Sequence, residues 1–202
     1  MADRAERPSP HPEPPKDLFE RTLPLLQVQD SCYRIHRSEH SPLYYGQSAK
    51  NRFDASNEEY GVMYVALSPY GAFIETFGSE TGVRIVAKSE LSVRSISTLT
   101  SQHALNLVDI TGPGLAHLGA DGRLCTGDHK LAQRWAMALW EHPAQVDGIY
   151  YRARHDLSQP CAAIFDRTKI VFDIVNTRTC TSKSFEKDLA LILESYQFGF
   201  IE

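Results

Sequence analysis

Two arginines, a tyrosine and a glutamate in the first half of the chain carry side chains suited to a phosphorylated ligand. Guanidinium groups bind phosphate oxygens bidentately and stay charged, so Arg34 and Arg52 could form a phosphate clamp. Tyr64 could stack on a ring or donate its hydroxyl, and Glu75 could stabilise a developing cation or position a hydroxyl. The spacing alone favours a structural alternative, in which Glu75 forms a buried ion pair with Arg34 or Arg52. Tyr64 is then a core residue.

A short strand and a punctuated helix must position the last two of these side chains. The segment GVMYVAL, residues 61–67, is a short apolar run bounded by glycine and Ser-Pro, so it predicts a buried strand. Ser68 is suited to cap a helix, Pro69 to its first position and Gly78 to its end. Glu75 then falls in the last turn, where the helix dipole disfavours a negative charge. A carboxylate at that position requires a reason beyond packing.

The local pattern also predicts the surroundings of Arg34 and Glu75. Arg34 lies in the strand-like sequence CYRIHR, on the face opposite Tyr33 and Ile35, which we expect in the core. The residue four positions before Glu75 is Gly71, so the surface beside that carboxylate is expected to be low and open.

Length and composition indicate an ordinary globular protein. The 202 residues are 42% hydrophobic and 23% charged, with a net charge of −4, which suits one domain with a substantial core. Residues 1–17 are rich in proline and charge and are expected to form a flexible tail, leaving a single domain over residues 18–202. The net negative charge disfavours non-specific nucleic-acid binding, and the lack of a long apolar run disfavours a membrane span. The four cysteines are scattered and the sequence has no recognisable export signal, which together favour a cytoplasmic protein with reduced thiols.

Several common catalytic signatures do not occur in the sequence. The eight histidines form no HExxH pattern, so we expect no metal site. No GxGxxG, P-loop or GxSxG sequence is present, which disfavours two kinds of nucleotide site and the commonest serine hydrolases. Many short strand-like segments, among them residues 83–91, alternate with two or three helices, such as residues 130–141 and 184–196. This order predicts a mixed α+β domain.

Five motifs, taken in order, resemble the RES domain family: CYRIHR, NRFD, GVMYVALSPYGAFIETF, DGIYYRARHD and CAAIFDR. The resemblance extends over residues 31–176. It implies a fold similar to the ADP-ribosyltransferases, with a split β-sheet core and surrounding helices around an NAD cleft. It also implies a toxin of a toxin–antitoxin pair, which destroys NAD by hydrolysis or phosphorolysis of the nicotinamide–ribose bond. The antitoxins of such pairs are helix-turn-helix proteins that cap the cleft.

The resemblance assigns roles to individual residues. The family's two arginines, its strand tyrosine and its glutamate fall on Arg34, Arg52, Tyr64 and Glu75. The family serine is replaced in this chain by Ala153, so a hydroxyl is missing whose hydrogen bond is worth about 0.5–1.5 kcal/mol. We expect this departure to affect catalysis more than NAD binding.

These assignments together imply an NAD-cleaving site. The two arginines would bind the diphosphate, and Glu75 would stabilise the oxocarbenium-like centre that forms as nicotinamide leaves. Tyr64 would supply an aromatic surface for nicotinamide, with Tyr44 and Tyr45 as alternatives.

The sequence therefore predicts a cytoplasmic enzyme that uses NAD as its substrate, with no cofactor and no metal. Its expected protein partner is a helix-turn-helix antitoxin, and a homodimer is a second assembly that we consider. We expect it to bind neither nucleic acid nor a membrane. Two alternatives remain open. One is ADP-ribosyl transfer to a macromolecule. The other is a catalytically weakened NAD-binding or interaction module, which Ala153 supports.

Overall fold

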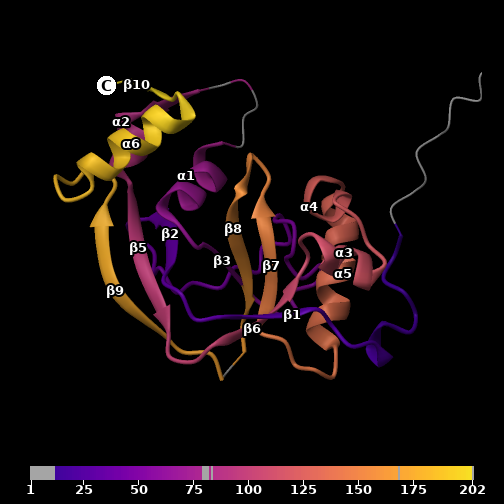
Figure 1. Cartoon of the computed structure of the whole chain (residues 1–202). Helices are drawn as coiled ribbons and strands as arrows, with labels where there is room; N and C mark the ends of the chain where they lie inside the picture. Colours follow the sequence, from indigo (N-terminus) through magenta and orange to yellow (C-terminus); the bar gives the residue numbers. More distant parts are fainter. Residues whose placement is uncertain (1–11, 79–81, 83, 168, 202) are drawn as a thin grey trace, which may run out of the picture.

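A computed structural model describes residues 12–78, 82, 84–167 and 169–201 (Figure 1). The strands are β1 (Leu25–Val28), β2 (Cys32–Arg37), β3 (Val62–Ala66), β4 (Ile85–Ala87), β5 (Arg94–Ser101), β6 (Leu105–Asp109), β7 (Gly148–Ala153), β8 (Asp156–Phe165), β9 (Phe172–Thr179) and β10 (Gly199–Ile201). The helices are α1 (Pro69–Phe77), α2 (Lys88–Ser92), α3 (Pro113–Leu118), α4 (Arg123–Thr126), α5 (His129–Glu141) and α6 (Glu186–Tyr196), and Leu18–Glu20 forms a 3-10 turn. The predicted mixed α+β class is confirmed.

Eight strands form one mixed sheet in the order β1-β6-β7-β8-β3-β2-β5-β9. Its neighbouring strands run antiparallel except for β6 and β7, which are parallel. Strands β2 and β3 pair only through Tyr33 and Ala66, whereas β2 pairs with β5 along its whole length. The sheet is therefore split between β2 and β3, and the two strands diverge from that one pair. The likeness to ADP-ribosyltransferases stays a prediction.

Helix α1 lies over this split, between α6 on one side and α3, α4 and α5 on the other (Figure 1), and contacts β2, β3, β7 and β8. Its boundaries follow from local chemistry. The Ser68 hydroxyl accepts a hydrogen bond from the Gly71 N–H at 3.0 Å, and Pro69 occupies the first turn. The Gly78 N–H donates to the Ile74 carbonyl at 2.8 Å and ends the helix. These boundaries are the predicted ones.

Gly71 has a different role from the expected one. It is buried, and a Cβ at this position would lie 3.0 Å from the Cβ of Ala66 and 3.3 Å from that of Gln159. Its missing side chain therefore lets α1 pack closely on β3 and β8. The open surface expected beside Glu75 is present, but Ala72 borders it and Gly71 does not, because the glycine faces the sheet.

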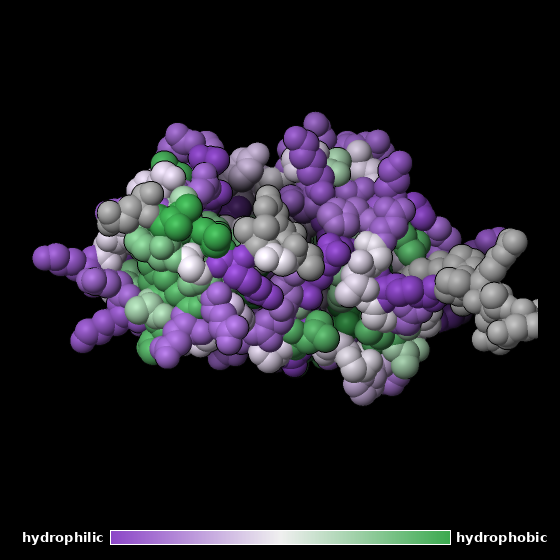
Figure 2. Space-filling model, turned by 90° about the horizontal axis from the view of Figure 1, so that it is seen from above, coloured by the Kyte–Doolittle hydropathy of each residue, from purple (hydrophilic) through white to green (hydrophobic). Residues whose placement is uncertain are grey.

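Two hydrophobic clusters lie on the two faces of the sheet. The larger one joins the sheet to α1, α5 and α6 and includes Phe73, Trp135 and Ile192. The smaller one, which includes Met63 and Leu99, fills the other face. Figure 2 shows apolar side chains gathered at the end of the molecule that carries α6 and the paired strands β4 and β10.

Residues 1–11 of the predicted tail lie outside the described residues, while Pro12 and Glu13 contact α5. The Pro12 carbonyl accepts a hydrogen bond from the Trp135 indole N–H at 3.0 Å, and Glu13 forms an ion pair with Arg134. The division of the chain into a tail and one domain stays a prediction. Within the described part of the chain, no helix has the length and apolar character that crossing a bilayer requires.

Candidate functional site

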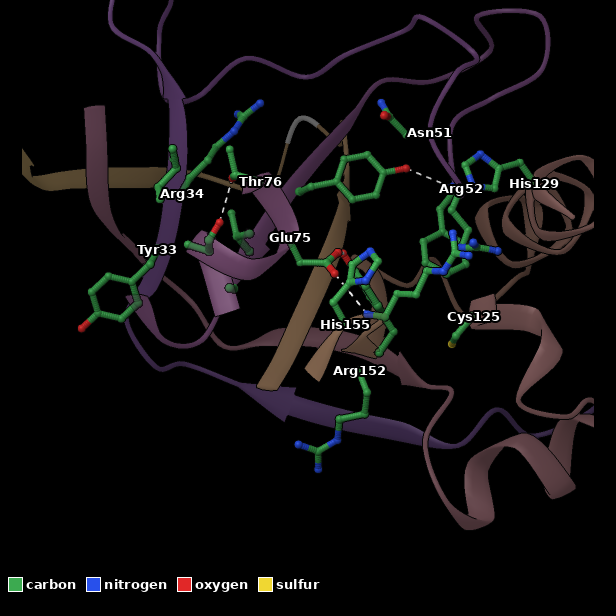
Figure 3. A pocket seen from close by; sticks show the side chains of 18 residues that line it. Tyr33, Arg34, Asn51, Arg52, Glu75, Thr76, Cys125, His129, Arg152 and His155 are labelled. Atoms are coloured by element: carbon green, nitrogen blue, oxygen red, sulfur yellow. Dashed lines mark hydrogen bonds between the residues drawn. The ribbon is translucent and has the colours of Figure 1, made fainter. Parts of the chain in front are cut away.

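A cavity of about 430 Å³ lies where the sheet is split (Figure 3). Strands β2 and β3 and helix α1 form its centre, and the loop before Phe53, the β7–β8 turn and the start of α5 complete it. Its size is typical of a small-molecule site. Arg34, Arg52, Tyr64 and Glu75 all line it, so the fold brings the four predicted side chains together.

The Glu75 carboxylate is held by two hydrogen-bond donors from β7 and the turn after it. The Tyr151 hydroxyl donates to Oε2 at 3.2 Å, and the Arg154 backbone N–H donates to Oε1 at 3.1 Å. Burial raises the pKa of the Tyr151 hydroxyl well above its ordinary value, so this group stays protonated and donates. Both partners are donors, and they stabilise a charge that the end of α1 disfavours. The site therefore presents the Glu75 carboxylate to the cavity in a fixed orientation.

Arg34 projects from β2 and is anchored by backbone carbonyls. Its Nη1 donates to the Pro42 and Tyr44 carbonyl oxygens, each at 2.7 Å. Burial lowers the pKa of Arg34, yet a guanidinium stays charged at neutral pH. Tyr44 is 59% exposed and does not line the cavity, so it contributes its carbonyl to this anchor.

Arg52 reaches the cavity from the loop before β3 and is anchored in the same way. Its Nη1 donates to the Gly127 carbonyl at 2.8 Å, and burial lowers its pKa. Among the described residues, neither Arg34 nor Arg52 forms an ion pair with a carboxylate. The structural alternative, an ion pair between Glu75 and one of these arginines, is therefore wrong.

Tyr64 presents its ring to the cavity but uses its hydroxyl within the protein. The hydroxyl accepts a hydrogen bond from the Phe53 N–H at 2.9 Å and donates one to Asp54 at 3.0 Å. Burial, followed by the nearby Asp54 charge, raises the pKa of Tyr64 well above its ordinary value. The ring face is available for stacking.

Ala153, the position of the family serine, is fully buried at the end of β7 and does not line the cavity. Its neighbours Arg152 and Arg154 do line it. The pairing of β7 with β8 is irregular between Arg152 and Ala153, at the point where the strand enters its turn. The nearby Ser158 hydroxyl donates to Asp156.

Further residues line the site to which the sequence assigned no role in it, among them Cys125, His129, Tyr151, Arg154 and His155. They come from α4, α5, β7 and its turn, at least fifty residues beyond Glu75 in the sequence. The alternating pattern of DGIYYRAR predicted a strand, but no local pattern predicted that the Tyr151 hydroxyl would donate to Glu75. Burial and the neighbouring Arg154 charge lower the pKa of His155, so this imidazole is mainly neutral at pH 7.

The charges of the cavity are strongly unequal. Among the described residues, four arginines line it and Glu75 is the only carboxylate. Figure 3 shows Glu75 between Arg34 on one side and Arg52 on the other, and Arg152 directed away from them. A cavity with guanidinium groups, an aromatic ring and one fixed carboxylate suits an anionic ligand that carries a ring and a local positive charge. No group of three or more metal-binding side chains occurs in the described ranges.

Comparison with known families identifies the class of protein. The RES domain model matches residues 31–183, so this chain belongs to the RES domain family. A chain in the crystal structure of the M. tuberculosis MbcT–MbcA toxin–antitoxin complex has a similar fold, with a TM-score of 0.65 and 16% sequence identity. The similarity covers 82% of this chain and 92% of that one, and at this identity it shows the fold alone. A search of curated proteins found no match.

Proposed function

We propose that this RES-family protein cleaves the nicotinamide–ribose bond of NAD. The observation that carries the proposal is the Glu75 carboxylate, which two donors hold in a cavity lined by arginines without carboxylate partners among the described residues. NAD combines an anionic diphosphate with a cationic nicotinamide riboside. The arginines suit the first group and Glu75 suits the second.

The proposed chemistry breaks the bond between ribose C1′ and the nicotinamide nitrogen. The bonding electron pair leaves with nicotinamide, which becomes neutral, and positive charge develops at C1′ and the ring oxygen. Glu75 stabilises that charge, and its fixed orientation reduces the reorganisation that the step requires. Water or phosphate then adds at C1′. Water loses a proton and gives ADP-ribose, whereas phosphate gives an ADP-ribose 1-phosphate.

Nicotinamide release tests this proposal directly. Purified protein is incubated with NAD, with and without phosphate, and nicotinamide is quantified chromatographically. Release in buffer without phosphate supports hydrolysis, and release only with phosphate supports phosphorolysis. Release that requires an added protein acceptor supports ADP-ribosyl transfer to a macromolecule. No release under any of these conditions contradicts the enzyme proposal.

Ala153 favours a second candidate, a catalytically weakened NAD-binding or interaction module. Saturable NAD binding without nicotinamide release would support it. The burial of Ala153 and its position outside the cavity lining count against it, because every cavity-facing group named above remains in place.

The proposed biological role is that of a cytoplasmic toxin held inactive by a helix-turn-helix antitoxin. Membership of the RES family supports it, as does the similar fold found in a structure titled as a toxin–antitoxin complex. Induced expression in a bacterial strain should deplete NAD and stop growth, and co-expression of a neighbouring helix-turn-helix gene should relieve both effects. Growth at a normal NAD level would contradict the role. A mass measurement in solution would test the proposed homodimer.

A further inference from the structure

Asp54 is a buried carboxylate that the proposed chemistry does not use. It is 0% exposed and, among the described residues, forms no ion pair with a basic group. Its Oδ2 accepts hydrogen bonds from the Ser48 hydroxyl at 3.1 Å and from the backbone and side-chain N–H groups of Asn51, each at 3.0 Å. Its Oδ1 accepts one from the Tyr64 hydroxyl at 3.0 Å. Burying a charge is costly, so this arrangement requires a reason.

We propose that Asp54 is a positioning residue for the substrate, because it closes the loop of residues 48–54 around its carboxylate and thereby holds Arg52 in the cavity. The inference deepens the proposed function and rests on it. Arg52 lies within the closed loop, between Asn51, which donates to Asp54, and Phe53, whose N–H donates to the Tyr64 hydroxyl. Both flanking residues are thus fixed through the Asp54 network.

Helix α5 holds the same loop from its other side. The Gln133 amide, buried in the fold, donates to the Ala49 carbonyl at 2.9 Å and to the Asn51 carbonyl at 3.0 Å. The His129 ring contacts the Lys50 carbonyl at 3.1 Å. Figure 3 shows His129 beside Asn51 and Arg52 at this end of the cavity. Ala49 has a left-handed backbone, with φ of 56°, a conformation that persists in a non-glycine residue when its surroundings impose it.

The chemistry of the network requires an aspartate at position 54. All four hydrogen bonds arrive from donors, and an ionised carboxylate only accepts. An asparagine of the same shape would place N–H groups against at least one of these donors. The carboxylate is also directed at hydroxyl and amide donors and not at Arg52. The positive charge of Arg52 therefore stays available to an anionic ligand.

The test compares Asp54→Asn with Asp147→Asn. Asp147 is also a buried carboxylate, but it lies outside the cavity, where it accepts the Asn106 N–H at 2.8 Å and pairs with Lys169 at 2.9 Å. Melting temperature, KM for NAD and kcat for nicotinamide release are measured for each variant at a temperature where it is folded. We expect Asp54→Asn to raise KM about tenfold, and Asp147→Asn to lower the melting temperature with KM unchanged. An unchanged KM in Asp54→Asn overturns the inference.

A double-mutant cycle with Arg52→Ala separates positioning from general destabilisation. If Asp54 acts through Arg52, Asp54→Asn has no further effect on KM once Arg52 is alanine. If the KM change of the double variant equals the product of the changes in the two single variants, the inference is overturned. Should Asp54→Asn fail to fold, Ser48→Ala removes one of the four donors, and we expect it to raise KM about threefold in the same cycle.

The dissociation constant for inorganic pyrophosphate, measured by calorimetry, distinguishes the two proposals. If wild-type protein releases no nicotinamide, the proposed function fails. The inference about Asp54 can still be tested, because it then predicts that Asp54→Asn binds pyrophosphate more weakly than the wild type. If wild-type protein does not bind pyrophosphate, the inference about Asp54 fails as well.

Discussion

Replacing Tyr151 by phenylalanine tests whether Glu75 acts as a carboxylate held in a fixed orientation. The Tyr151 side chain is 6% exposed, its hydroxyl donates to Glu75 Oε2 at 3.2 Å, and its ring packs edge-on against Phe53 with centroids 5.3 Å apart. Phenylalanine keeps this packing. The substitution therefore removes one hydroxyl and one hydrogen bond.

The size of the effect follows from the geometry. A hydrogen bond to a charged group contributes about 1.5–3 kcal/mol, but 3.2 Å is long for O–H···O. Glu75 is also exposed to solvent, so water can replace the lost donor, and the Arg154 N–H remains in place at 3.1 Å. We therefore expect a loss of about 1–1.5 kcal/mol in transition-state stabilisation, which corresponds to a fall in kcat of about 5–13-fold.

Steady-state nicotinamide release from NAD is the assay, with Tyr150→Phe as the matched control. Tyr150 precedes Tyr151 on β7 but does not line the cavity, and its ring lies under the Arg152 guanidinium at 5.8 Å. We expect Tyr151→Phe to lower kcat while KM changes less than about twofold, and Tyr150→Phe to change neither. An unchanged kcat in Tyr151→Phe, or an equal loss in both variants, would refute the assignment.

Three further predictions concern single positions. Ala153→Ser restores the family serine at a buried position outside the cavity lining, so we expect kcat to change less than about twofold; a large rise in kcat would show that the missing hydroxyl weakens the enzyme. Burial raises the pKa of the Cys125 thiol to about 11, so alkylation at pH 8, followed by mass spectrometry, should be about 10²-fold slower than for a free cysteine and slower still with NAD. Alkylation of Cys125 at the rate of a free thiol would contradict this. Gly71→Ala should destabilise the protein by about 1–3 kcal/mol in denaturant unfolding, because the new Cβ would lie 3.0 Å from that of Ala66; unchanged stability would show that α1 can shift.

Local chemistry predicted the helix that carries the proposed catalytic carboxylate. Ser68, Pro69 and Gly78 determine the ends of α1, and each acts through contacts within a few residues. Such contacts can be read from the sequence. The segment of residues 83–91 shows the limit of this approach, because its alternation predicted one strand, whereas the chain forms β4 followed by α2. Strand β4 pairs with β10 at the far end of the chain, and no local pattern contains that contact.

Only those residues of the site that belong to the family motifs were predicted from the sequence. Arg34, Arg52, Tyr64 and Glu75 were placed in one cavity by the resemblance, and the structure brings them there. The groups that orient them were not predicted. Tyr151 reaches Glu75 from 76 positions away in the chain, and the Tyr64 hydroxyl serves Asp54.

The orienting groups depend on how strands from both halves of the chain pair in the sheet. Strand β8 is the element that pairs with both β3 and β7, and it thereby brings them close enough to share one cavity. Spacing between motifs contains no information on that pairing.

Nicotinamide release by wild-type protein and by Glu75→Gln is the measurement that tests the central claim most directly. Glutamine has the shape of glutamate but no charge, so the Tyr151 and Arg154 donors face a neutral group. We predict release by the wild type and a fall in kcat of about 10²–10³-fold or more in Glu75→Gln, with the melting temperature and NAD binding largely retained. Equal release by both proteins would contradict the account, because Glu75 would then have no part in the cleavage of NAD.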